Sequence, residues 1–196
     1  MDRVTHEWVR RVTRALPLPE PIVEFGGRYR ERALERDGLR PLRELLPAGT
    51  KYTACDLRSG SGVDQIEDML CSSFPMGSVG TVIACNVLEH VRDPIAAMTE
   101  VLRILDPERG VLLLQSLFVY HIHGAPVDYW RFTPFAFKDI LLERFAHRVV
   151  EGIGLNKEKQ GPRWVTGVAT RDFNQDLSGV ATCLVDSWKH FGQCTR

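Results

Sequence analysis

Apolar side chains recur at helical spacing near the start of the chain, at Val4, Trp8, Val9 and Val12. This spacing of three and four residues predicts an amphipathic helix within residues 1–20. Pro17 and Pro19 follow it, and proline ends a helix because it lacks the amide hydrogen that the next turn needs. We therefore expect the chain to begin with a helix that buries one face.

Continuous apolar runs follow this helix and predict buried strands. They lie in residues 21–27, 51–58, 80–87 and 111–118, and residues 62–66 are a shorter candidate. Apolar runs without polar alternation are typical of parallel strands that are covered on both faces. Residues 147–154 and 163–171 are two further candidates, and the second alternates as an antiparallel strand does.

Helical patterns separate several of these runs. Residues 94–105 place one apolar face at Ile95, Met98, Val101, Leu102 and Leu105. Asp93 and Pro94 supply the N-cap and the first-turn proline that favour a helix start. Residues 133–145 give a second helix, and a final helix is expected from about 177 to 191.

This alternation of strands and helices predicts the fold class. Helices between successive strands favour a parallel sheet, whereas the last two strands have no helix between them and predict a hairpin. We expect an α/β protein with a Rossmann-like doubly wound sheet, mostly parallel with an antiparallel edge hairpin, in a single domain. Residues 1–20 are the N-terminal helix, residues 21–172 the Rossmann-like core and residues 173–196 a C-terminal helical extension.

Charge and composition narrow the classes of partner and compartment. The 196 residues hold 25 basic and 25 acidic side chains, so a nucleic-acid partner, which favours basic proteins, is not expected. No apolar run reaches the roughly 18 residues of a membrane span, and the charged start lacks the apolar core of a signal peptide. The five cysteines show no CxxC pattern and three lie in apolar stretches, which favours small buried side chains over disulfides or zinc ligands. We expect a cytoplasmic protein.

Acidic residues close three of the expected strands. They include Glu24, Asp56 and Asp68, and the ligand of a doubly wound sheet lies beyond these strand ends. A carboxylate at Asp56 can accept both hydroxyls of a ribose, and a set of acids suits a cationic ligand. Gly26 and Gly27 let a ligand approach the backbone closely. In a structural alternative, Glu24 and Asp56 only cap loops.

The glycine fingerprint of dinucleotide binding, G-x-G-x-x-G, is absent at this turn. Arg28, Tyr29 and Arg30 follow Gly27 instead. A nicotinamide-dependent oxidoreductase on the same fold is therefore the less favoured reading.

Five segments together resemble class I S-adenosylmethionine-dependent methyltransferases of the broad type 11 group. They are VEFGG (23–27), YTACDLRSGSGVD (52–64), QIEDMLCSSFP (65–75), the unit from 81 to 118, and HGAPVDYWRFTP (123–134). Each segment is a weak signal alone, but their order and spacing are specific. The resemblance covers roughly residues 22–145.

The resemblance implies S-adenosylmethionine as the cofactor and S-adenosylhomocysteine as its product. It places Glu24, Gly26 and Gly27 beside the methionine part of the cofactor, with Asn86 beneath it. It assigns the ribose hydroxyls to Asp56.

The same resemblance assigns the adenine to the next two strand ends. Leu57 or Arg58 would flank the ring, and Asp68 would accept from the adenine amino group. The backbone amide of Met69 would contact the ring.

Two arginines depart from the family pattern. Arg28 stands where a further glycine is usual, and Arg30 where another often follows. They either narrow the cofactor pocket or bring positive charge toward the methionine carboxylate. They also support an alternative, a degenerate relative that acts as a non-catalytic binding or regulatory subunit.

The segment 120–131 is rich in histidine and aromatic residues and follows a central strand, which suits a loop that covers a ligand. His121 and His123 alternate, so at most one is expected to face the cleft. Gly124 favours His123, which becomes the candidate catalytic base. The candidates for substrate binding are His90, His121, Asp128, Tyr129, Trp130 and Arg131. In the structural alternative, the residues from 128 to 131 clamp the loop and His90 is a cap or a packed side chain.

These observations favour methyl transfer to a hydroxyl or amine of a small-molecule acceptor. A histidine that titrates near neutral pH can take the proton of such an acceptor. No histidine–carboxylate spacing matches a metal motif, so no metal is expected. The chain has few inserted segments, which suggests an open site or one that a second copy or a partner subunit completes.

Overall fold

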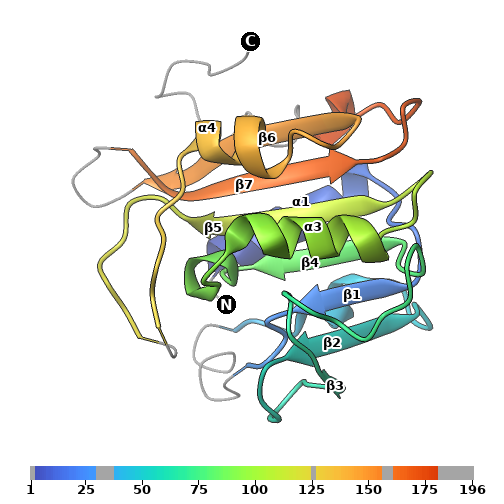
Figure 1. The fold of residues 1–196 in the computed structure, drawn as a ribbon, viewed down its shortest axis with the longest axis horizontal. Coiled ribbons are helices and arrows are strands. Elements are labelled where there is room, and N and C mark those ends of the chain that lie inside the picture. The colour runs from blue at the N-terminus through green and yellow to red at the C-terminus, as the bar shows by residue number, and fades with distance from the viewer. Residues whose placement is uncertain (1–2, 30–37, 125–126, 156–160, 181–196) are drawn as a thin grey trace.

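The fold is described here by a computed structural model, which covers residues 3–29, 38–124, 127–155 and 161–180. Seven strands form one sheet in the order β3-β2-β1-β4-β5-β7-β6 (Figure 1). They are β1 (Ile22–Phe25), β2 (Tyr52–Asp56), β3 (Gln65–Ile66), β4 (Thr81–Cys85), β5 (Val111–Leu117), β6 (His147–Leu155) and β7 (Pro162–Thr170).

The first five strands are parallel, and the last two are antiparallel. β7 pairs with β5, and β6 pairs with β7 to form the edge of the sheet. The mostly parallel Rossmann-like sheet with an edge hairpin is confirmed. The strand order reverses between β1 and β4, and such a switch point is where doubly wound sheets bind ligands.

Helices cover both faces of the sheet. In Figure 1, α3 (Pro94–Ile104) lies in front of the sheet and α1 (Arg3–Ala15) lies behind it. One apolar cluster fills the space under α3 and a second fills the space under α1. β5 is buried along its whole length, as its continuous apolar run predicts.

The start of α3 is fixed by its cap. A side-chain oxygen of Asp93 accepts hydrogen bonds from the amides of Ile95 and Ala96, at 3.1 and 2.9 Å, and Pro94 begins the helix. The expected apolar face is wrong at one position, because the Ile95 side chain is 60% exposed. Ile95 belongs to the first turn, and Ala97 joins the expected Met98 in the buried face instead.

The helix expected over 133–145 is much shorter. The Thr133 hydroxyl accepts from the amide of Ala136, and one α-helical turn, α4 (Pro134–Ala136), follows. The chain then widens into a π-helical turn, Phe137–Leu141. The described part of the chain also contains two 3₁₀ turns, η1 (Leu42–Leu45) and η2 (Leu88–His90).

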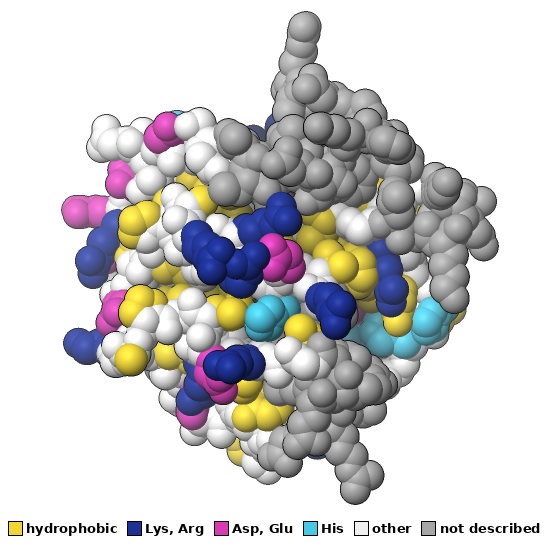
Figure 2. Space-filling model, turned by 180° about the vertical axis from the view of Figure 1, so that it is seen from behind, with side chains coloured by type: hydrophobic (Ala, Val, Ile, Leu, Met, Phe, Trp, Pro, Cys, Tyr) yellow, Lys and Arg dark blue, Asp and Glu magenta, His cyan; other side chains and the backbone are white. Residues whose placement is uncertain are grey.

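The outer face of α1 is charged. Glu7 accepts hydrogen bonds from Arg10 and Arg11, at 2.6 and 2.8 Å, and Figure 2 shows basic and acidic side chains gathered on this side. None of the described helices has the length and apolar character that crossing a membrane requires. Of the helix expected over 177–191, residues 178–180 are helical and those from 181 onward lie outside the described residues.

Candidate functional site: a cavity at the strand ends

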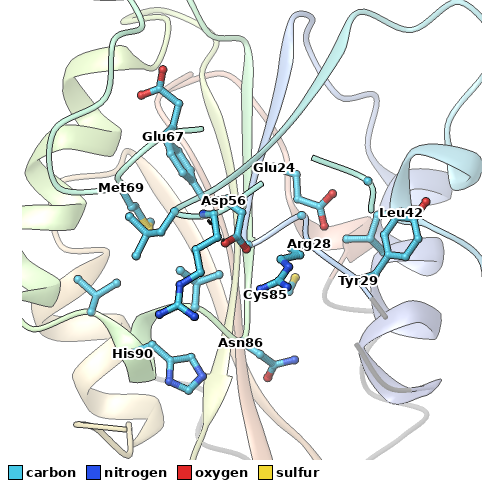
Figure 3. Close-up of a pocket in the computed structure, with 18 of the residues that line it drawn as sticks. Glu24, Arg28, Tyr29, Leu42, Asp56, Glu67, Met69, Cys85, Asn86 and His90 are labelled. Carbon is cyan, nitrogen blue, oxygen red and sulfur yellow. Dashed lines mark hydrogen bonds between the residues drawn. The ribbon is translucent and has the colours of Figure 1, made fainter. Parts of the chain in front are cut away.

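A cavity of about 550 Å³ lies at the carboxyl ends of the parallel strands (Figure 3). Its volume falls in the range of small-molecule sites. Its wall contains all nine residues expected to hold a cofactor, namely Glu24, Gly26, Gly27, Asp56, Leu57, Arg58, Asp68, Met69 and Asn86. The topology therefore brings together four segments, at the ends of β1, β2, β3 and β4, that are separate in the sequence.

The turn after β1 requires its glycines. Gly26 has a φ of +77°, and a Cβ there would lie 2.4 Å from the Val87 side chain. A Cβ on Gly27 would lie 2.7 Å from the Cβ of Ala54. Both distances are shorter than real Cβ contacts, so only glycine lets this turn pass so close to β2 and to the segment after β4.

Glu24 is the acid that the end of β1 brings to the cavity. Its Oε2 accepts a hydrogen bond of 2.5 Å from the Tyr52 hydroxyl. Burial raises the pKa of Glu24 to about 6, against the lowering effects of the Tyr52 hydrogen bond and the charge of Arg43. Arg43 itself pairs with Asp64 at 2.6 Å. Glu24 is thus an acid whose charge changes close to neutral pH.

Asp56 ends β2 and has one oxygen engaged locally. Its Oδ1 accepts from the amide of Arg58 at 3.1 Å, which is the loop-cap role of the structural alternative. Figure 3 shows the Asp56 side chain in the middle of the residues that line the cavity. A cap through one oxygen leaves the other available for a ligand.

The segment after β3 forms the next part of the wall. Asp68 accepts from the amide of Leu70 at 2.8 Å, and Met69 is 4% exposed and packs into the core under α3. Glu67 also lines the cavity, which the sequence analysis did not predict. The carboxylate of Glu67 accepts from the Ser73 amide at 2.9 Å and from the Ser73 hydroxyl.

Asn86 follows β4 in a backbone conformation that is unusual for a residue with a side chain. Its φ is +56°, a left-handed value that asparagine tolerates better than most residues. Its Nδ2 donates to the Thr5 hydroxyl of α1 at 3.3 Å. Its Oδ1 is buried and has no hydrogen-bond partner among the described residues. An unpaired buried oxygen in a cavity wall is a candidate contact for a ligand.

The other lining residues have no local sequence signal, except Arg28, which the sequence analysis singled out at this turn. They are Phe25, Arg28, Tyr29, Pro41, Leu42, Arg43, Gly62, Cys85, Val87 and Val91. Arg28 packs across Gly60, where a Cβ would lie 2.6 Å from its Nε. Arg28 therefore does reach the cavity wall, while Arg30 lies outside the described residues.

The loop after β5 is anchored by a charge pair. Asp128 meets Arg131 through two hydrogen bonds of 2.6 Å, and its side chain is 2% exposed. Arg131 also donates to the carbonyls of Tyr120 and His121, at 3.1 and 2.8 Å. The hydrogen bonds from Arg131, together with its positive charge, lower the pKa of Asp128. These contacts are the ones that the clamp alternative describes.

Two aromatic neighbours attach the same loop to η2. The amide of Tyr129 donates to the carbonyl of Glu89 at 2.7 Å, and the indole of Trp130 donates to the carbonyl of Val91 at 2.9 Å. Of the described residues of the loop, Gly124 lines the cavity. The structure thus sets residues 128–131 behind the cavity wall.

His90 and His123 hold different positions relative to the cavity. His90 is part of the wall, and Figure 3 shows its ring beside Asn86. His123 packs edge-on against His90, with ring centroids 5.0 Å apart. His121 packs against Tyr120 at 4.1 Å between centroids. His123, the candidate base, therefore contacts a residue of the cavity wall and is not itself part of that wall.

Comparisons with known proteins agree with this fold. Residues 41–114 match a family model described as a methyltransferase domain. A search among curated proteins finds no match. Among solved structures, the CMeT domain of citrinin polyketide synthase aligns with 86% of this chain and 51% of its own, at 18% identity and a TM-score of 0.59.

Two further structures share the same architecture. Phosphoethanolamine N-methyltransferase 2 from Haemonchus contortus, in complex with S-adenosyl-L-methionine, aligns at 10% identity with a TM-score of 0.60. This covers 85% of the present chain and 52% of that one. A complex of a Haloferax volcanii methyltransferase with the Trm112 activator aligns at 15% identity and a TM-score of 0.56, covering 88% and 92% of the two chains.

The fold and the family match over residues 41–114 agree with each other. The sheet is that of class I S-adenosylmethionine-dependent methyltransferases, and the resemblance seen in the sequence is confirmed. The chain spans about half the length of the citrinin polyketide synthase CMeT domain and of phosphoethanolamine N-methyltransferase 2.

Proposed function

We propose that this protein is an S-adenosylmethionine-dependent methyltransferase whose acceptor is a hydroxyl or amine of a small molecule. The observation that carries the proposal is that all nine expected cofactor residues line one cavity at the switch point of the sheet. The methyltransferase-domain match over residues 41–114 and the neighbours solved with S-adenosylmethionine or S-adenosylhomocysteine support it.

The chemistry of the cavity fits this cofactor. The close turn at Gly26 and Gly27 leaves backbone exposed to a ligand where a Cβ would clash. Glu24 and Asp56 supply negative charge, which suits the sulfonium and ammonium groups of the methionine part and the hydroxyls of a ribose. The unpaired Oδ1 of Asn86 offers an acceptor for the same ammonium group.

When bound, the cofactor supplies a methyl group on a positively charged sulfur. The residues of the cavity hold the ligand in line with the acceptor and exclude water. Positioning of this kind contributes on the order of 7–11 kcal/mol in favourable cases. No residue needs to protonate the thioether that leaves, so the remaining task of the protein is to accept a proton from the acceptor.

We assign the acceptor side of the cavity to the wall formed by His90 and Gly124. His90 presents its ring to the cavity, and His123 supports that ring from behind. In this proposal the candidate base of the sequence analysis acts together with His90 rather than directly at the acceptor. His121 and the residues from 128 to 131 hold the loop that carries Gly124.

The loop over the acceptor side also carries exposed apolar surface. Ile122 is 88% exposed, and Tyr129 and Trp130 are 48% and 41% exposed. Such surface supports the expectation that a second copy or a partner subunit completes the site. Light scattering of the purified chain at several concentrations distinguishes a self-associating protein from a monomer that needs another subunit.

Release of S-adenosylhomocysteine tests the proposed activity. The purified protein is incubated with S-adenosylmethionine and a panel of small hydroxyl and amine acceptors, with Asp56→Ala as the inactive control. Acceptor-dependent product that Asp56→Ala loses supports the proposal. A folded protein that binds neither S-adenosylmethionine nor NADH and forms no product supports the degenerate subunit instead, with Arg28 in the wall as its structural basis.

A further inference from the structure

Three side chains of ligand type meet at the acceptor side of the cavity. Glu89 and His90 come from η2, and His123 comes from the loop after β5. One ligand atom from each residue lies within 4.8 Å of those of the other two. Two imidazoles and one carboxylate are a common donor set for divalent transition metals.

The carboxylate of Glu89 lacks a compensating partner. Its side chain is fully buried, and its Oε2 accepts from the Ser116 hydroxyl at 2.6 Å. Its Oε1 is buried and has no hydrogen-bond partner among the described residues. A carboxylate with one bare oxygen is costly in the interior of a protein unless a proton or a cation meets it. The bare oxygen is therefore a position for either a proton or a bound cation.

The two imidazoles are held in the orientation that metal ligands need. The Nδ1 of His90 lies 2.6 Å from the carbonyl oxygen of Val127, and a carbonyl only accepts, so this nitrogen carries the proton. The Nε2 of neutral His90 then keeps a lone pair. A backbone carbonyl or carboxylate behind each histidine is the usual outer contact of a metal ligand.

His123 has the corresponding support from a carboxylate. Its Nδ1 lies 3.0 Å from Oδ2 of Asp128, at ion-pair distance although not aligned as a hydrogen bond. The negative charge of Asp128, which the two-point contact with Arg131 holds in place, favours the proton on that Nδ1. The Nε2 of His123 is then the nitrogen with a lone pair.

We propose that Glu89, His90 and His123 bind one divalent transition-metal ion of the zinc type. Imidazole nitrogens suit zinc, cobalt and iron, whereas magnesium and calcium prefer a shell of oxygens. The three donors leave coordination positions open, as catalytic zinc sites do. This assignment goes beyond the sequence analysis, which expected no metal because the three residues do not form a linear motif.

His90 lies in the cavity wall, so an open coordination position faces the acceptor side. There the ion would bind an acceptor hydroxyl and lower its pKa, so that the hydroxyl could lose its proton to solvent water without the base role that the sequence analysis gave to His123. This role rests on the proposed methyltransferase function. The metal site itself does not, because its residues and contacts are independent of any cofactor.

Cobalt titration of the metal-free protein tests the site. The chain is stripped with a chelator and titrated with Co²⁺, whose visible absorption reports the ligands, and Zn²⁺ is then added as competitor. We expect one equivalent of Co²⁺ to bind with a Kd in the micromolar range or tighter and Zn²⁺ to displace it. Mg²⁺ at the same concentration should give no displacement.

Matched variants show whether these three residues are the ligands. Glu89→Gln and His123→Asn should each weaken Co²⁺ binding at least about tenfold. His147→Asn is the control, since His147 is exposed and contacts the carbonyl of Phe173 instead. Thermal melts followed by circular dichroism show whether each variant is folded. If Glu89→Gln does not fold, Co²⁺ binding by His123→Asn alone tests the assignment of the ligands.

Two outcomes overturn the metal site. One is a folded wild-type protein that binds no Co²⁺ or Zn²⁺, and the other is binding that His147→Asn weakens as much as His123→Asn does. Calorimetry with S-adenosylhomocysteine on the same sample separates the two proposals. Metal binding without cofactor binding contradicts the methyltransferase proposal alone, and cofactor binding without metal binding contradicts the metal site alone.

Discussion

The imidazole of His123 packs edge-on against the imidazole of His90, although one residue follows β5 and the other follows β4. β4 and β5 are neighbouring parallel strands, so their carboxyl ends meet at one edge of the sheet. The same edge carries the glycine turn after β1 and the acid at the end of β2. The proposed cofactor and acceptor sides therefore share one cavity because the strand order reverses there.

The pKa of Glu24 gives a prediction for cofactor affinity. A pKa of about 6 leaves Glu24 almost fully ionised at pH 7.5 and about a tenth ionised at pH 5. The charged form attracts a cationic ligand, so affinity for S-adenosylmethionine should fall about tenfold between these two pH values. Calorimetry at several pH values measures this, and Glu24→Gln should bind more weakly at pH 7.5 and lose the dependence. An equally steep dependence in Glu24→Gln would refute the assignment.

Gly27 is predicted to be intolerant of a side chain. A Cβ at this position would lie 2.7 Å from the Cβ of Ala54, so Gly27→Ala should lower the free energy of unfolding by about 1–3 kcal/mol. Gly179→Ala is the matched control, because a Cβ there has no neighbour within 4 Å. Denaturant titration compares the two variants. Equal stability of Gly27→Ala and Gly179→Ala would contradict the close approach of β1 and β2 at the turn.

The Asp128–Arg131 pair is predicted to stabilise the loop after β5. Asp128→Asn removes charge from a carboxylate that accepts three hydrogen bonds, and it should cost about 1.5–3 kcal/mol. Glu44→Gln, which breaks the exposed pair of Glu44 with Arg40 at 3.6 Å, should cost well under about 1 kcal/mol. Thermal or chemical unfolding of both variants checks this difference.

Cysteine labelling gives a footprint of the cavity. Cys85 lines the cavity, whereas Cys71 is exposed and is not part of the wall. Bound S-adenosylhomocysteine should therefore slow the alkylation of Cys85 and leave that of Cys71 unchanged. Peptide mass spectrometry reads both sites in one sample. Cys55 is an internal reference for slow reaction, because burial raises the pKa of its thiol to about 12.

Much of the cavity wall could be predicted from the sequence. Strand ends are marked by a change from apolar to polar residues, and parallel strands bring their ends together, so Glu24, Asp56 and Asn86 could be found without coordinates. The polar pair Gln115–Ser116 near the end of the apolar run of β5 marks a strand end in the same way, although the sequence analysis drew no prediction from it. Ser116 in fact holds Glu89.

The acceptor side could not be predicted in the same way. Whether His90 or His123 faces the cavity depends on how the loop after β5 folds back onto η2, through contacts such as Tyr129 with Glu89. These contacts join positions far apart in the sequence, and they leave no periodic pattern of apolar residues from which they could be predicted. Whether the Arg28 side chain lines the cavity could not be predicted either. An arginine at a turn can point into solvent or lie across a neighbouring glycine, as Arg28 does at Gly60.

Local patterns also misplaced parts of the helices. Ile95 has the spacing of a buried residue but lies in the first turn of α3, where it is exposed. The segment after Thr133 has a good cap and proline, yet the chain leaves the α-helical path after one turn to bury Phe137 and Leu141. In both cases packing against the sheet decides the outcome rather than helical propensity.

Calorimetric titration with S-adenosylhomocysteine tests the central claim, that this cavity holds the cofactor. The samples are the wild-type protein, Asp56→Ala and the control Asp139→Ala, whose side chain is exposed on the π-helical turn. We expect micromolar binding to the wild type and to Asp139→Ala, and a loss of at least about tenfold in Asp56→Ala, since charge-assisted hydrogen bonds contribute about 1.5–3 kcal/mol. No binding to a folded wild type, or equal binding by Asp56→Ala, would contradict the claim.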